Sequence, residues 1–177
     1  AAGKIAPLSA MADNDYALGM IVEALSKSKF WPATAIFVLE DDAQNGPDHV
    51  DSHPSPAYIL SPYPRRGVID NTMYNTTSML RTMELIVGLR PMSHFDAAAR
   101  PMWAAFTNKP DPRPYEAEKP RIPLDDRNPA TSATAARSAR FDFSEADRID
   151  DDEMNEIFWR ALRTTEPPAP VRSWFSR

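Results

Sequence analysis

Apolar residues recur at a spacing of three or four in several stretches of the chain, which is the pattern of an amphipathic helix. The first stretch predicts a helix over 14–27, with Asp13 or Asn14 as its N-cap, after an irregular lead-in over 1–12. Similar patterns, some of them short, recur further along the chain. The other expected helices are 76–87, 95–106, 130–140 and 150–162.

Two continuous apolar runs of strand length, 35–39 and 57–61, follow the first predicted helix. Because the first run lacks polar alternation, we expect a strand covered on both faces, as in the centre of a parallel sheet. Helix, strand, loop, strand and helix together predict an α/β fold. Since two strands do not complete a doubly wound sheet, we expect the rest of the sheet to come from residues outside this sequence.

The amino-acid composition predicts loops of restricted flexibility. The 177 residues include 18 prolines but only 5 glycines, so a phosphate-binding loop of the Walker or dinucleotide type is absent. Proline and charged residues concentrate in 108–129. Such a composition favours extended, polyproline-like backbone over a flexible linker. We therefore predict a strap that lies over the surface of the protein.

Charge and cysteine content exclude several classes of function. The formal net charge is -5 and the basic residues are scattered, which argues against a nucleic-acid partner. No cysteine is present, so disulfides, thiolate chemistry and sulfur-ligated zinc are excluded. No apolar run approaches the roughly 20 residues of a membrane-spanning helix.

The segment 40–53 carries the chemistry of this sequence, because it combines carboxylates with imidazoles directly after the first apolar run. Open α/β sheets bind ligands at such strand ends. Carboxylate and imidazole groups are typical ligands of metal ions in hydrolases. The simpler alternative is a solvated acidic turn. The groups are Glu40, Asp41, Asp42, Asp48, His49, Asp51 and His53.

Two common metal-binding motifs do not fit this segment. A calcium loop of the EF-hand type would place Ala43 and Ser52 at ligand positions. His49 and His53 are four residues apart, as in a helical zinc motif. The glutamate of that motif is absent, and Pro54 disfavours a continuing helix. His94 stands alone and is interpreted as structural or exposed.

The order of these residues resembles a bacterial phosphoesterase family, related to phospholipase C and acid phosphatases, in the alkaline phosphatase superfamily. The resemblance rests on 37–42 and 46–53, with shorter matches over nearly the whole chain. It implies the C-terminal portion of an alkaline-phosphatase-like α/β/α sandwich with a proline-rich, partly helical tail. In that scheme 1–107 forms part of the catalytic core, and 108–177 is the strap with a C-terminal helix packed on it. The shorter matches are 12–19, 61–67, 78–82, 88–92 and 143–159.

The resemblance also implies a site for two divalent metal ions, with Zn, Mn, Fe and Ca all left open. Asp41 and Asp42 would bind one metal ion and His53 the other. Asp42 stands where the wider superfamily often has histidine, which makes the site richer in oxygen. Asp48 and His49 would contact the substrate or orient a metal ligand. A purely structural role, in which these two side chains brace the loop, is equally open.

The implied function is metal-dependent hydrolysis of phosphate monoesters or diesters, in the periplasm or outside the cell. We find no match to the serine or threonine nucleophile of the superfamily, so we expect it upstream and expect this chain alone to be inactive. The alternative is a non-catalytic scaffold or binding module with the same fold. Residues 76–78, Arg65 and Arg66 are weaker candidates for phosphate contacts, since helix capping and surface ion pairing explain them.

Overall fold

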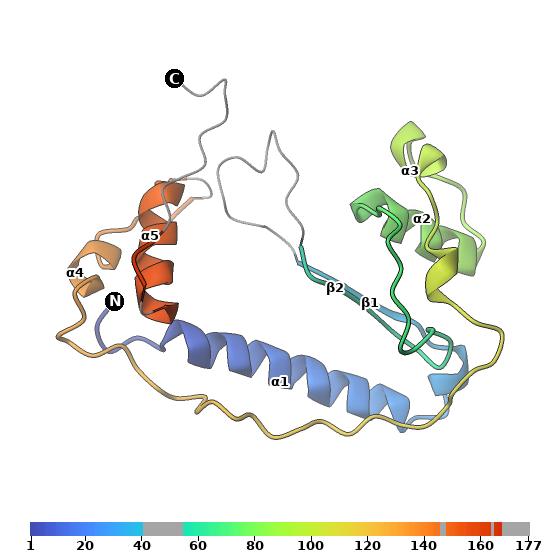
Figure 1. Ribbon diagram of the computed structural model, residues 1–177, viewed down its shortest axis with the longest axis horizontal. Coiled ribbons are helices and arrows are strands. Elements are labelled where there is room, and N and C mark those ends of the chain that lie inside the picture. Colours follow the sequence, from blue (N-terminus) through green and yellow to red (C-terminus); the bar gives the residue numbers. More distant parts are fainter. Residues whose placement is uncertain (41–54, 146–147, 164, 168–177) are drawn as a thin grey trace. The chain divides into compact units, whose positions relative to one another are not determined.

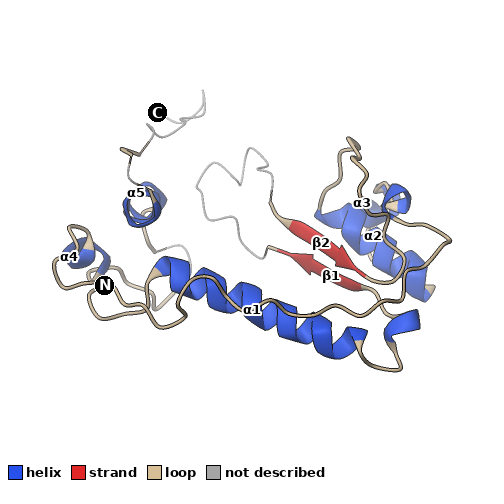
Figure 2. Ribbon diagram, turned by 60° about the horizontal axis from the view of Figure 1, so that its bottom comes forward, coloured by secondary structure: helices blue, strands red, loops and turns tan. Residues whose placement is uncertain are grey.

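The computed structural model describes residues 1–40, 55–145, 148–163 and 165–167. Helices and loops dominate these residues, with one short pair of strands (Figures 1 and 2). The elements are α1 (Pro7–Ser26), a 3-10 turn (Trp31–Ala33), β1 (Ile36–Leu39), β2 (Ala57–Leu60), α2 (Thr76–Val87), α3 (His94–Ala98), a 3-10 turn (Trp103–Ala105), α4 (Ala135–Ser138) and α5 (Asp151–Leu162).

The chain divides into two compact units, which are described separately below. Of the described residues, the first unit contains Ala1–Met20, Ser55 and those from Ala117 onward. The second unit contains Ile21–Glu40 and Pro56–Glu116. The predicted boundary between a catalytic core over 1–107 and a strap with a C-terminal helix over 108–177 stays a prediction.

Helix α1 begins at Pro7, so the prediction of an irregular lead-in over 1–12 with a cap at Asp13 or Asn14 is wrong. Proline is favourable at the first helical position, where its missing N–H would have had no partner. The first intrahelical bond follows at once, from the Ala10 N–H to the Ala6 carbonyl at 3.0 Å. Asp13 and Asn14 are exposed on the helix surface, where a short polar run resembles a capping signal.

The two predicted strands are confirmed, and they form an antiparallel two-stranded sheet. Ile36 lies opposite Leu60, and Leu39 lies opposite Ala57. All four β1 side chains are half-buried, less than the burial expected at the centre of a parallel sheet. The described chain is therefore a mixed α/β structure with a small antiparallel sheet, and the larger sandwich stays a prediction.

The second unit is organised around buried Trp31 and helix α2. The ring of Trp31 is 2% exposed and meets Tyr115 edge to face, with 5.9 Å between ring centroids. Helix α2 has the predicted bounds 76–87, and it ends at Gly88, whose φ of 74° favours glycine. The predicted helix over 95–106 is instead split into α3 and a 3-10 turn. Pro101 explains the break, because proline disfavours helical conformation both at its own position and at the residue before it.

The predicted strap is confirmed as an extended segment without helix or strand. In the first unit it lies beside α1, as both ribbon views show (Figures 1 and 2). The buried Ser9 hydroxyl of α1 donates to the Pro123 carbonyl at 2.7 Å. A Cβ atom on Gly19 would lie 3.4 Å from that of Ala117, so glycine permits the close approach of helix and strap.

Helices α4 and α5 complete the first unit. The predicted helix over 130–140 is reduced to Ala135–Ser138, whereas the helix predicted over 150–162 is confirmed as Asp151–Leu162. Asp150 caps α5 by accepting a hydrogen bond from the Glu153 N–H at 2.8 Å. The buried apolar side chains of these two helices are Ala135, Met154 and Ile157.

Candidate functional site

The predicted ligands Asp41, Asp42 and His53, and the accompanying Asp48 and His49, all lie outside the described residues. Their predicted roles are therefore neither confirmed nor contradicted. Elsewhere, among the residues that the structure does describe, no group of three or more His, Cys, Asp or Glu side chains could hold a metal ion.

The structure does describe the residues that flank the acidic segment at both ends. The Glu40 N–H donates to the Pro56 carbonyl, with 3.3 Å between the nitrogen and the oxygen. Proline has no N–H to return this bond, so this pair lacks the second hydrogen bond of a regular antiparallel pair. Residues 40 and 56 are therefore paired at one end of the hairpin, next to the terminal pair Leu39 and Ala57.

The start of α2, considered as an anion-binding position, is occupied by its own capping contacts. The Asn75 side-chain oxygen accepts from the Ser78 N–H at 2.9 Å and from the Thr77 hydroxyl at 2.8 Å. The Ser78 hydroxyl in turn accepts from the Asn75 N–H at 3.3 Å, which completes a capping box. Capping thus accounts for Thr77 and Ser78, as the sequence indicated.

Arg65 and Arg66 make structural contacts within the second unit. Arg65 Nε donates to the Phe106 carbonyl at 2.9 Å. Arg66 forms an ion pair with Asp111 at 3.2 Å and donates to the Tyr115 hydroxyl at 3.2 Å. The expectation of a surface ion pair is confirmed for Arg66, and this arginine holds the beginning of the strap.

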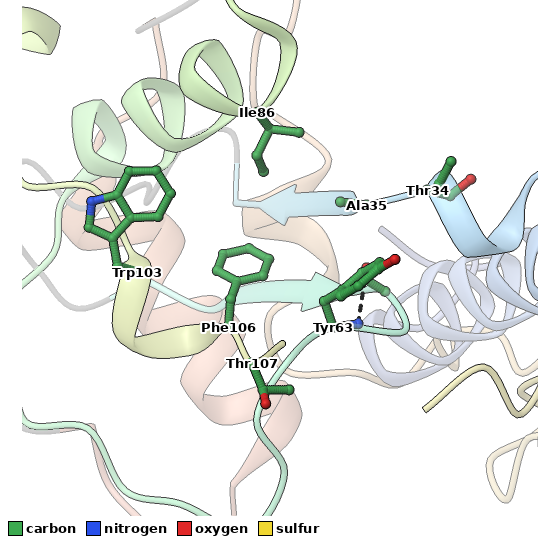
Figure 3. Close-up of a pocket in the computed structure, with 9 residues that line it drawn as sticks. Thr34, Ala35, Tyr63, Ile86, Trp103, Phe106 and Thr107 are labelled. Carbon is green, nitrogen blue, oxygen red and sulfur yellow. Dashed lines mark hydrogen bonds between the residues drawn. The ribbon is translucent and has the colours of Figure 1, made fainter. Parts of the chain in front are cut away.

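An apolar pocket of about 260 Å³ opens in the second unit, between the start of β1, the end of α2 and the second 3-10 turn (Figure 3). Trp103 is 58% exposed and Ile86 is 50% exposed, so the pocket leaves a large apolar surface open to solvent. The pocket is lined by Ala33, Thr34, Ala35, Ser61, Tyr63, Ile86, Trp103, Phe106 and Thr107.

The chemistry of this pocket suits an apolar group and not a phosphate. No charged side chain lines it. Two of its hydroxyls are already engaged: Thr34 donates to the Phe30 carbonyl at 2.7 Å, and Tyr63 donates to the Pro32 carbonyl at 3.1 Å. The sequence does not predict the pocket, because it predicts a single helix over 95–106, whereas Trp103 lines the pocket from a separate 3-10 turn.

Comparison with protein families finds no family that matches the chain, and comparison with curated proteins finds no match either. No helix within the described ranges is both long and apolar enough to cross a membrane.

Proposed function

We propose that this chain carries part of the metal site of a phosphoesterase that hydrolyses phosphate monoesters or diesters. The proposal rests on the sequence of the acidic segment and on its resemblance to phosphoesterases of the alkaline phosphatase superfamily. The same resemblance supports a nucleophile upstream of this chain, a larger α/β/α sandwich, and a location in the periplasm or outside the cell.

The paired strand ends are the structural observation that supports this proposal. In the sequence, Asp41 and Asp42 follow Glu40 directly, and His53 precedes Pro56 by three positions. The bond from the Glu40 N–H to the Pro56 carbonyl anchors both ends of this segment at the same end of the hairpin. Asp41 and Asp42 at one end of the segment, and His53 near the other, are therefore joined through the chain to backbone positions that are hydrogen-bonded to each other.

The donor set fits divalent metal ions of hydrolytic enzymes. The carboxylates of Asp41 and Asp42 would hold one ion and the neutral imidazole of His53 the other. Two bound ions would supply charge stabilisation for phosphate oxygens and activation of a nucleophile. Because the imidazole must be neutral to bind, metal affinity should fall as the pH drops below the ordinary histidine value of about 6.5.

Metal binding tests the proposed ligands directly. Native mass spectra of the purified chain with Zn²⁺ or Mn²⁺ should show bound metal that is lost in Asp41→Ala and reduced in His53→Ala. Asp13→Ala and His94→Ala remove the same kinds of group at exposed positions outside the segment, and they should retain the metal. Equal metal binding by all four variants would exclude the proposed ligands.

Hydrolysis tests the function itself. The full-length gene product should hydrolyse p-nitrophenyl phosphate or its bis-ester, and Asp41→Ala and His53→Ala should abolish this activity without changing the circular dichroism spectrum. Full activity in both variants would overturn the proposal. Metal binding without hydrolysis of either ester would favour the alternative, a scaffold that retains the fold without catalysis.

A further inference from the structure

Each strand of the hairpin has an outer edge in addition to the edge that it shares with the other strand (Figure 2). Along an antiparallel pair, positions that exchange hydrogen bonds alternate with positions that do not. The bond from the Glu40 N–H to the Pro56 carbonyl marks that pair as a bonded position. In the next pair, Leu39 and Ala57 therefore point their N–H and C=O groups away from each other, toward the outer edges.

The same alternation assigns the other residues of β1. Val38, which lies opposite Tyr58, bonds toward β2, whereas Phe37 directs its backbone groups outward as Leu39 does. No backbone hydrogen bond from Phe37 or Leu39 to any segment beyond β2 is found within the described ranges. The outer edge of β1 thus presents unpaired N–H and C=O groups, which are a template for a further strand.

The chain directly after β2, in contrast, is already paired. The Thr107 N–H donates to the Tyr63 carbonyl at 2.9 Å, and the Asp111 N–H donates to the Pro62 carbonyl at 2.8 Å. Natural sheets guard their exposed edges with charged side chains, prolines or bulges. The sequence of β1, Ile36–Leu39, contains neither a charge nor a proline. Of the two strands, β1 is therefore the one whose edge is open to a partner.

The edge of an antiparallel strand is complementary to a second copy of itself. With a two-fold axis at Val38, Phe37 lies opposite Leu39 of the second copy, and Leu39 lies opposite Phe37 of the second copy. Both pairs exchange hydrogen bonds, so one contact satisfies the outward groups of both chains. Val38 then faces Val38 of the second copy at a position without hydrogen bonds, where side chains approach most closely. All of these side chains are uncharged, so no like charges meet.

We propose that the chain forms a two-fold dimer in which β1 pairs with β1 of a second copy. The two hairpins join into one four-stranded antiparallel sheet. Next to the start of β1, Ile86 and Trp103 in the apolar pocket are 50% and 58% exposed and extend the apolar surface. A four-residue edge is small beside the roughly 1,200 to 2,000 Å² that stable interfaces bury, so the dimer is weak. We expect a dissociation constant between about 1 μM and 1 mM.

Two measurements on the unaltered chain test this dimer. In analytical ultracentrifugation, the mass should rise with concentration from 19.8 kDa toward twice that value. In the same concentration series, hydrogen exchange followed by NMR should show growing protection of the Phe37 and Leu39 amides but not of the Ala57 and Ile59 amides. A single-chain mass at about 1 mM would overturn the proposal and favour a strand of another protein as the occupant of the edge. A dimer without protection at Phe37 and Leu39 would overturn it as well.

Charge substitutions at the two-fold axis test the register. Val38→Lys places two ammonium groups opposite each other, and Val38→Glu places two carboxylates there, so each variant alone should raise the dissociation constant at least about tenfold. An equal mixture of the two variants should restore the dimer, because opposite charges then face each other. Tyr58→Lys and Tyr58→Glu are the matched controls, since Tyr58 lies opposite Val38 on β2 and is 55% exposed. They should dimerise like the unaltered chain, alone or mixed.

The mixture separates a contact at the axis from general damage to the fold. If the two Val38 variants fold, as judged by circular dichroism, but stay monomeric when mixed, the proposed register is wrong. Equal losses in the Tyr58 variants would also contradict pairing through the edge of β1. If the Val38 variants do not fold, the amide exchange of the unaltered chain decides.

Discussion

The two units of the chain hold their polar side chains in different surroundings. In the second unit Thr82 is completely buried, and its hydroxyl donates to the Ser78 carbonyl at 2.7 Å and accepts the Met102 N–H at 2.9 Å. The first unit also buries the Ser9 hydroxyl, but its helices α4 and α5 are joined by ion pairs, such as Arg137 with Glu156 at 2.9 Å, whose side chains are about one-third exposed. Breaking a buried hydrogen bond leaves an unsatisfied group, whereas water replaces much of an exposed ion pair.

The apolar side chains of the second unit are also more deeply buried than those of the first unit. The second unit buries the large ring of Trp31, together with Val22 and Met79. The first unit buries the small Ala135 with Met154 and Ile157, at 7% to 9% exposure. We therefore expect substitutions of buried residues in the second unit to lower the free energy of unfolding more than substitutions in the first unit.

Trp31→Ala should give the largest effect. The indole is 2% exposed and packs edge to face on Tyr115, so its removal leaves a cavity beside Tyr115 of the strap within the second unit. Truncation of a buried aromatic side chain costs about 3 to 5 kcal/mol of unfolding free energy. Urea denaturation followed by circular dichroism measures this loss.

Two variants control for side-chain type. Trp103→Ala removes an indole that is 58% exposed in the same unit, and it should cost far less. Trp31→Phe keeps an aromatic ring and removes a buried Nε1–H that has no partner among the described residues, so it should be milder than Trp31→Ala. Equal losses for Trp31→Ala and Trp103→Ala would contradict the ranking.

Thr82→Val should give an intermediate effect. Valine has nearly the same shape, but it leaves the Met102 N–H without its acceptor just before the second 3-10 turn. An unsatisfied buried donor costs about 1 to 3 kcal/mol. Thr82→Ser keeps the hydroxyl and should retain most of the stability in the same denaturation experiment. If Thr82→Val is as stable as the unaltered protein, the Met102 bond is not a stabilising contact.

The sequence predicted elements well where the local signals agreed. For α2, the apolar periodicity predicted the bounds 76–87 that the structure has, and there Asn75 caps the start and Gly88 ends the helix. For α1 the signals competed, because Pro7 at a helix start looks like a loop residue and Asp13 inside a helix looks like a cap. Ser9, in the first turn of α1, is buried and donates to the Pro123 carbonyl, and such a contact with a distant segment cannot be read from a single sequence.

Contacts between distant parts of the chain could not be predicted. The burial of Glu84 and Asp96 depends on how α2 and α3 pack, and the two residues separately look like ordinary helical acids. The apolar pocket likewise depends on the break before Trp103, which brings the 3-10 turn close to Ile86 and Ala35. The predicted ligands Asp41, Asp42 and His53 lie outside the described residues, so their arrangement stays a prediction.

The smallest effect is expected for the exposed ion pairs of the first unit. The Arg137 guanidinium, followed by that of Arg160, lowers the pKa of Glu156 to about 2. An unfolded glutamate titrates near 4.3, so this contribution to stability is present above that pH and is lost as the pH falls towards about 2.

Glu156→Gln should therefore lower the melting temperature only slightly at neutral pH, and it should make the remaining acid-induced loss shallower. Added salt should shrink the difference between variant and unaltered protein, because exposed pairs are screened. Thermal melts between strong acid and neutral pH, with Glu118→Gln as the control, measure both quantities. A salt-insensitive loss as large as that of Thr82→Val would show that these ion pairs belong with the buried contacts of the second unit, and the contrast between the two units would then fail.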